Sequence, residues 1–71
     1  MFWTVIEIQM TAGGAKACLT TIYDAYDDAL AKLYTILAAA AKSEIPYHAA
    51  CILSNGITVT DGKVFDRRTE V

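Results

Sequence analysis

Residues 24–42, DAYDDALAKLYTILAAAAK, are the stretch that decides the fold, because they predict one long helix. Strong helix formers fill the stretch, and neither Gly nor Pro interrupts it. Asp24 is suited to the N-cap, and Asp27, three residues on, is suited to a capping box. The acidic residues at the start and Lys42 at the end also complement the helix dipole. A helix is therefore expected over about residues 25–42.

This helix is expected to bury one apolar stripe against a sheet. The stripe consists of residues three and four apart: Tyr26, Ala29, Leu30, Leu33, Leu37 and Ala40. A second stripe beside it consists of Ala31, Tyr34 and Ala38. It leaves the helix apolar around much of its circumference. Two explanations stay open for this second stripe. Either alanine is present for its helix propensity, or these three residues contact a second subunit.

The flanking segments are rich in β-branched and aromatic residues and predict two β-hairpins. The first pairs strands at about residues 2–10 and 15–23 around a turn containing Gly13-Gly14. The second pairs strands at about residues 47–54 and 57–67 around Asn55-Gly56, a strong hairpin signal. Pro46 ends the helix before the second hairpin. Asp61-Gly62 predicts either a bulge or a second tight turn.

The predicted fold is α+β, with the element order ββαββ in a single domain covering residues 1–71. One long helix packs on one face of a four-stranded, mainly antiparallel sheet. The face toward the helix is expected to carry Phe2, Ile6, Ile8 and Met10. The alternate residues of the first strand are expected on the open face: Trp3, Val5, Glu7 and Gln9. Trp3 and Val5 are therefore candidates, with the second helix stripe, for an oligomer interface.

Composition limits the classes of partner. A 71-residue chain buries only about 60% of its unfolded surface, yet 55% of its residues are hydrophobic, so self-association as a homo-oligomer is expected. The net charge of −2 argues against binding a nucleic-acid polymer. No segment approaches the roughly 20 apolar residues of a membrane span, and no N-terminal signal is visible, so a cytoplasmic protein without a membrane partner is expected.

The two cysteines, Cys18 and Cys51, are too few for a secreted disulfide scaffold. They are expected to be reduced and buried, and they can pair only if their strands are adjacent. No catalytic or metal constellation is expected either. His48 and Cys51 are three residues apart on one strand and so point to opposite faces. The acidic residues at the helix start are explained by capping, and the chain is interpreted as a non-enzyme without a cofactor.

Several segments together resemble a group of small uncharacterised proteins of bacteriophages and prophages of gut Firmicutes. They are ALAKLYTILAAAA in the helix, PYHAACIL in the third strand, the Asn55-Gly56 turn and KVFDRR at the end. The resemblance covers nearly the whole chain and carries no catalytic motif. It implies a phage setting, and hence the host cell cytoplasm, but no reaction.

Binding residues are more evident than catalytic ones. Arginine suits bidentate contact with phosphate, and aromatic rings stack on bases. The candidate ligand residues are Trp3, Tyr23, Tyr47, His48, Lys63, Phe65, Arg67 and Arg68. If a subunit interface brings them together, they would hold a small nucleotide or cyclic dinucleotide. Alternatively Phe65 belongs to the core, Arg67 pairs with a nearby carboxylate, Trp3 is a dimer contact and His48 is structural.

Two hypotheses for function follow. The first is a phage homo-oligomer that sequesters a small nucleotide immune signal of the host at a subunit interface. The second is a small structural or protein-interaction component, such as a virion accessory or an inhibitor of a host protein.

Overall fold

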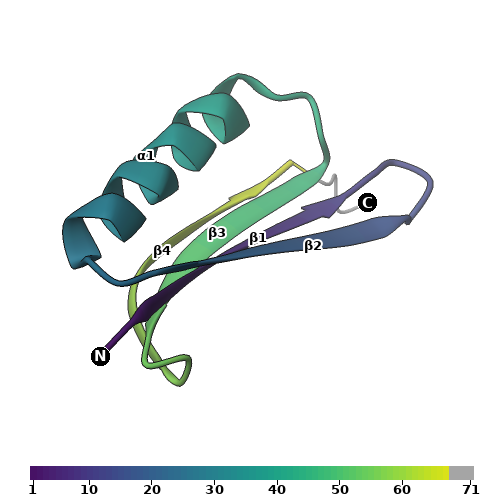
Figure 1. Cartoon of the computed structure of the whole chain (residues 1–71). Helices are drawn as coiled ribbons and strands as arrows, with labels where there is room; N and C mark the ends of the chain where they lie inside the picture. The colour runs from purple at the N-terminus through teal and green to yellow at the C-terminus, as the bar shows by residue number, and fades with distance from the viewer. Residues whose placement is uncertain (68–71) are drawn as a thin grey trace.

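The computed structural model describes residues 1–67 and contains four strands and one helix (Figure 1). The strands are β1 (Trp3–Met10), β2 (Lys16–Tyr23), β3 (Tyr47–Ser54) and β4 (Thr58–Asp66). The helix α1 (Tyr26–Lys42) connects β2 to β3 and lies across one face of the sheet. The predicted α+β fold with ββαββ order is confirmed. No helix within residues 1–67 has the length and hydropathy that a membrane crossing requires.

The sheet is antiparallel throughout, with the strand order β2-β1-β3-β4. The two hairpins therefore meet along β1 and β3, and β2 and β4 form the edges. The register places Ile8 of β1 between Cys18 of β2 and Ala49 of β3, and Ala49 opposite Val64 of β4. Because directly opposed residues share a face, this register fixes which side chains lie together on each side of the sheet.

The hairpin turns follow the local sequence. Asn55 and Gly56 both have positive φ, 53° and 75°, as a tight two-residue hairpin turn requires. Asn55 also binds the neighbouring strand: its N–H donates to the Phe2 carbonyl at 2.8 Å, and its Oδ1 accepts from the Phe2 N–H at 3.2 Å. The turn thereby joins the second hairpin to the start of the first.

The start of the helix differs from its prediction. Ala25 is the N-cap, in an extended conformation, and makes no side-chain capping bond. Asp24 is therefore not the cap, because β2 stays paired as far as Tyr23 and the helix begins only at Tyr26. Asp27 and Asp28 still lie in the first turn and Lys42 in the last, where their charges favour the helix dipole.

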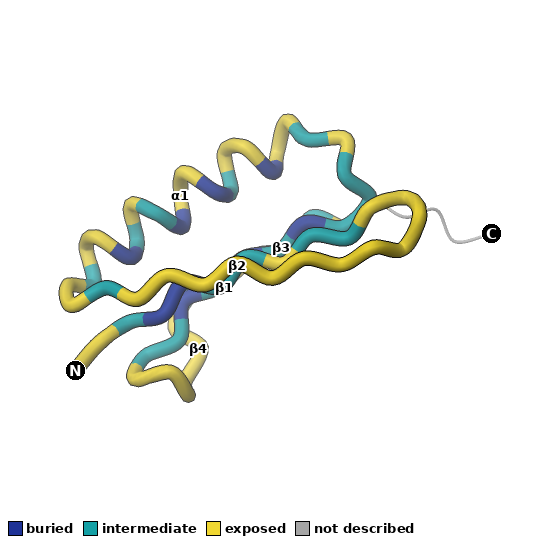
Figure 2. Tube along the Cα trace, turned by 45° about the vertical axis from the view of Figure 1, so that its right-hand side comes forward, coloured by how far each residue is buried: buried dark blue, intermediate teal, exposed yellow. Residues whose placement is uncertain are grey.

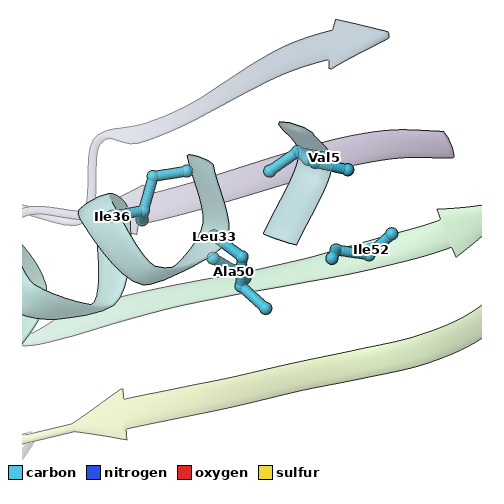
Figure 3. Close-up of a cluster of buried hydrophobic side chains, with 6 residues drawn as sticks. Val5, Leu33, Ile36, Ala50 and Ile52 are labelled. Atoms are coloured by element: carbon cyan, nitrogen blue, oxygen red, sulfur yellow. The ribbon is translucent and has the colours of Figure 1, made fainter. Parts of the chain in front are cut away.

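The core lies between α1 and the two central strands, and it uses the opposite face of β1 from the one predicted. Val5 is 2% exposed and packs with Leu33 and Ile36 of α1 and with Ala50 and Ile52 of β3 (Figure 3). Trp3 also packs against this cluster. Phe2 and Ile8 are exposed instead. The expectation that Val5 and Trp3 lie on the open face is therefore wrong.

The helix stripe is close to its prediction. Ala29, Leu33 and Ala40 are buried, and Tyr26, Leu30 and Leu37 are half-buried around them (Figure 2). Ile36 is an addition that the predicted stripe omitted. The second stripe is exposed at Ala31, Tyr34 and Ala38. These residues are therefore accessible to a second subunit on this side of the helix.

A bulge, and not a second turn, interrupts β4. Ile52 pairs with Asp61 while Leu53 pairs with Val59, so Thr60 is the extra residue. Gly62, two residues after Thr60, lies against β3. A Cβ at position 62 would lie 3.0 Å from Cys51 Cβ and 3.3 Å from the Ala50 carbonyl oxygen. Glycine is thus needed here for a close approach between the strands.

Gly62→Ala should lower the free energy of unfolding by about 1–3 kcal/mol, because the added methyl crowds Cys51 Cβ and the Ala50 carbonyl, which side-chain rotation cannot move away. Gly13→Ala is the matched control. Its nearest neighbour would be Thr11 Oγ1 at 4.0 Å, so a change within about 0.5 kcal/mol is expected. Urea unfolding of both variants measures the difference. Equal stability of the two would contradict the close approach.

Candidate functional site

The predicted ligand residues separate into two groups at opposite ends of the sheet. Trp3 is opposite Tyr23 at the start of β1. At the other end of the sheet, His48 is opposite Phe65, next to the pair Tyr47 and Asp66. A single chain therefore does not bring all of these residues together. Arg68 lies outside the described residues.

The first group forms an aromatic cluster beneath the start of the helix. The rings of Trp3 and Tyr26 are 5.9 Å apart between centroids and tilted by 58°. The Tyr26 hydroxyl donates to Asp61 Oδ2 at 2.6 Å, and this hydrogen bond raises the pKa of Tyr26. Trp3 and Tyr23 both pack against the core. These contacts explain the cluster as part of the fold.

The second group presents two cations to one ring on edge strand β4. Lys63 Nζ lies 5.1 Å and Arg67 Cζ 5.3 Å from the centroid of Phe65. Lys63 and Phe65 are two residues apart and therefore point to the same side of the sheet, the side of the helix. Cations at such distances are attracted by the ring quadrupole. The result is a concentration of positive charge beside a half-buried aromatic ring. We call Lys63, Phe65 and Arg67 the basic-aromatic group.

Arg67 also has a structural role. Its Nη2 donates to the carbonyl of Ala40 at 2.7 Å and to that of Ala41 at 3.2 Å, and its backbone N–H donates to Pro46 at 2.6 Å. The carbonyls of Ala40 and Ala41 lie in the last turn of α1, where the usual helical donors four residues on are absent and a positive charge is favourable; that of Ala40 also accepts the Ser43 N–H at 3.2 Å. A guanidinium has five N–H donors, so these bonds orient Arg67 without using all of its capacity.

A buried polar cluster lies under the helix at the same end of the sheet. His48 is 3% exposed, and its Nε2 lies 2.5 Å from Glu7 Oε2. Gln9 Nε2 donates to the same oxygen at 2.9 Å. The placement of His48 favours the structural alternative over a ligand contact. The expectation that Glu7 and Gln9 lie on the open face is wrong, because Glu7 contacts His48 beneath the helix and Gln9 donates to the same carboxylate.

Burial alone would raise the pKa of Glu7. Hydrogen bonds from His48 and Gln9, with the nearby charges of His48 and Lys32, outweigh burial and leave that pKa below its usual value. Glu7 and Lys32 also line a hollow of about 270 Å³ between α1 and β2. The hollow exists because the helix lies over the central strands and leaves β2 almost wholly exposed (Figure 2).

The far side of the sheet is called the open face. The register assigns to it Thr4, Ile6, Ile8, Met10, Lys16, Cys18, Thr20, Ile22, Tyr47, Ala49, Cys51, Leu53, Val59, Gly62, Val64 and Asp66. A groove of about 450 Å³ crosses it. Small residues of β3 and β4 form the floor of the groove, namely Ala49, Cys51 and Gly62, with Ile6 and Ile8 on one side and Val59 and Val64 on the other.

The cysteines and the histidine are not arranged for catalysis. Cys51 lines the open-face groove, whereas His48 lies under the helix, so the prediction of opposite faces is confirmed. Burial raises the pKa of the Cys51 thiol, and the neighbouring Cys18 adds to the effect. A raised pKa disfavours the reactive thiolate. Both thiols are free because β1 separates their strands, and Cys18 is exposed, contrary to expectation.

Within residues 1–67 no three His, Cys, Asp or Glu side chains lie close enough to hold a metal ion. In comparisons with known proteins, no family model, no curated protein and no solved structure matched the chain. The function of the basic-aromatic group and of the open face is therefore inferred from the contacts and register described above.

The Glu7–His48 contact should make stability depend on pH. Because the pKa of Glu7 is lower in the folded state, its ionised form stabilises the fold above the unfolded pKa. This contribution is lost as the pH falls through the folded pKa. Glu7→Gln should therefore flatten the acid limb of a plot of unfolding free energy against pH, measured by urea unfolding between pH 7 and pH 3.

Glu44→Gln is the matched control for this prediction, because Glu44 is exposed in the loop after the helix. It should leave the acid limb unchanged. An identical acid limb in wild type and Glu7→Gln would show that the contact does not favour ionised Glu7.

Proposed function

We propose that this protein is a non-enzymatic binding protein that acts as a homo-oligomer and captures a small phosphorylated aromatic ligand, such as a nucleotide or cyclic dinucleotide. The observation that carries the proposal is the basic-aromatic group, in which Lys63 and Arg67 both lie near the ring of Phe65. Phosphate is bound well by such cations, and a base can stack on a neighbouring ring or guanidinium plane.

The setting of this group supports the proposal further. Lys63 is exposed on an edge strand, so a ligand reaches its ammonium without opening the core. Arg67 is held by the end of α1, so part of the cost of ordering its long side chain is met before binding. Capture of this kind needs no acid–base residue. A protein that only sequesters its ligand therefore fits these contacts.

The resemblance to small phage and prophage proteins suggests which ligand to test first. Under this proposal a phage protein that captures nucleotides would remove a host immune signal from the cytoplasm. The sequence-based hypothesis placed the ligand between subunits. The basic-aromatic group lies on one chain, so we propose one such site for each subunit.

The second candidate function is a structural or protein-interaction component. It is favoured by the exposed apolar side chains of the open face, among them Ile22 at 64% and Val64 at 52% exposed. Exposed apolar surface of this kind is typical of surfaces that bind another protein.

Thermal melts with cyclic dinucleotides and ADP-ribose derivatives test the ligand proposal. A ligand present at about 100 times its Kd should stabilise the fold by about 2.7 kcal/mol. Lys63→Gln should lower the affinity for that ligand by roughly tenfold or more, since a charged hydrogen bond contributes about 1.5–3 kcal/mol. Lys63 is preferred to Arg67 for this test, because loss of Arg67 also removes the donor to Ala40 and Ala41.

Lys32→Gln removes a lysine that lines the hollow between α1 and β2, toward the opposite edge of the sheet from β4, and should leave ligand binding unchanged. Absence of a thermal shift with every nucleotide would reject ligand capture and favour the protein-interaction function. A shift that Lys63→Gln does not reduce would place the ligand elsewhere on the chain.

A further inference from the structure

The open face is suited by its charge pattern to one particular partner. Among its described residues only Lys16 and Asp66 are charged, and both lie in the same row at the end of the strands. That row runs Lys16, Met10, Tyr47 and Asp66 across the sheet. One edge of the face therefore ends in a positive charge and the opposite edge in a negative charge. By the register no other charged side chain among the described residues points to this face, although Lys63, whose side chain points to the helix side, also lines the groove.

The shape of the open face is also complementary to itself, because it has a ridge and a groove side by side. The groove over β3 and β4 has the small residues Ala49 and Cys51 in its floor, while β1 beside it carries the larger Ile6 and Ile8. In the register, Ile8 is directly beside Ala49, and Ile6 is directly beside Cys51. A ridge on β1 thus lies beside a groove, displaced by one strand.

We propose that a second copy of this chain covers the open face, related by a two-fold axis that runs parallel to the strands between β1 and β3. This axis places β1 of one copy over β3 of the other. Ile8 then lies over the partner's Ala49, and Ile6 lies over the partner's Cys51, so each ridge enters a groove. Contacts across such a dimer axis are reciprocal, and they occur twice.

The same axis brings the charges together. It places β2 of one copy over β4 of the other, so Lys16 faces Asp66 of the second copy and Asp66 faces its Lys16. Two sheets packed this way cross by about 30°, and the flexible lysine stem can span the resulting offset. A two-fold axis perpendicular to the strands would instead place Lys16 over Ile22, which is unfavourable for a charge.

The area is sufficient for a specific dimer. Strands of eight residues at about 3.3 Å each are about 26 Å long, and four strands that each occupy about 4.8 Å of width cover about 19 Å. Each copy thus contributes roughly 500 Å² of flat area, or about 1,000 Å² for the pair before side-chain relief is counted. This meets the usual lower limit for a biological interface. A small domain of marginal stability also gains from the added burial.

This inference rests on the homo-oligomer of the proposed function and assigns its interface. That interface differs from the helix surface of Ala31, Tyr34 and Ala38. The side chains of Lys63 and Phe65 point to the other side of the sheet, although Lys63 also lines the groove, so dimerisation and ligand capture are measured by separate readouts.

Sedimentation equilibrium of the full chain provides the first test. Wild type should have twice the mass of the 7.7 kDa chain at about 100 µM. Val64→Asp, which introduces two charges into the interface, should weaken the dimer at least a hundredfold. Tyr34→Asp is the control, because Tyr34 is 61% exposed on the helix. It should leave the dimer intact. A monomeric wild type, or a dimer broken by Tyr34→Asp and not by Val64→Asp, would overturn the proposal.

A second test uses edge charges and keeps the proposal falsifiable if Val64→Asp does not fold. Lys16→Glu and Asp66→Lys should each weaken their own homodimer by roughly tenfold, because each creates two like-charge pairs. An equimolar mixture should form heterodimers of wild-type affinity, since both contacts are then between opposite charges. Failure of the mixture to recover affinity would reject the axis parallel to the strands, and a different protein bound to the open face would become the alternative.

Thermal shifts with the nucleotide panel are measured on the same samples. If wild type is monomeric but a nucleotide still raises its melting temperature, the dimer proposal has failed and ligand capture stands. If wild type is dimeric but no nucleotide raises its melting temperature, ligand capture has failed and the dimer stands.

Discussion

One helix of seventeen residues covers one face of a four-stranded sheet, and the described chain has no second layer for the other face. This constraint explains most of what is unusual about the protein. The core is confined to the contact of α1 with the central strands, and apolar residues remain exposed on the far side. Because so small a domain buries little surface by itself, association is the simplest way to complete the second layer.

Which face of the sheet becomes the core depends on a contact between distant parts of the chain. Glu7 and His48 are 41 residues apart and meet beneath the helix, where Gln9 also binds the carboxylate. This contact allows the face that carries Glu7 and Gln9 to be buried with Trp3 and Val5. Hydrophobicity along β1 favoured the other face, because Phe2, Ile6 and Ile8 are all apolar.

Local features were therefore predictable and the choice of face was not. Residues 24–42 specify a helix by composition alone, and Asn55-Gly56 specifies a hairpin by its tolerance of positive φ. The proximity of Lys63, Phe65 and Arg67 follows from the local sequence in the same way, because the first two lie on edge strand β4 and Arg67 directly follows it. The polar cluster of Glu7 and His48 was missed, since its members belong to different hairpins. Only the register of β1 with β3 brings them together.

The side chains of the basic-aromatic group on β4 point to the helix side of the sheet, so a second copy on the open face leaves the ring of Phe65 uncovered. We propose that a second copy covers the open face with β1 over β3. An isotope-filtered NOE experiment on dimers mixed from labelled and unlabelled chains tests it directly. The account predicts intermolecular contacts between the methyl groups of Ile8 and Ala49. Intermolecular contacts that come instead from Tyr34 and Ala38 on the helix would contradict it.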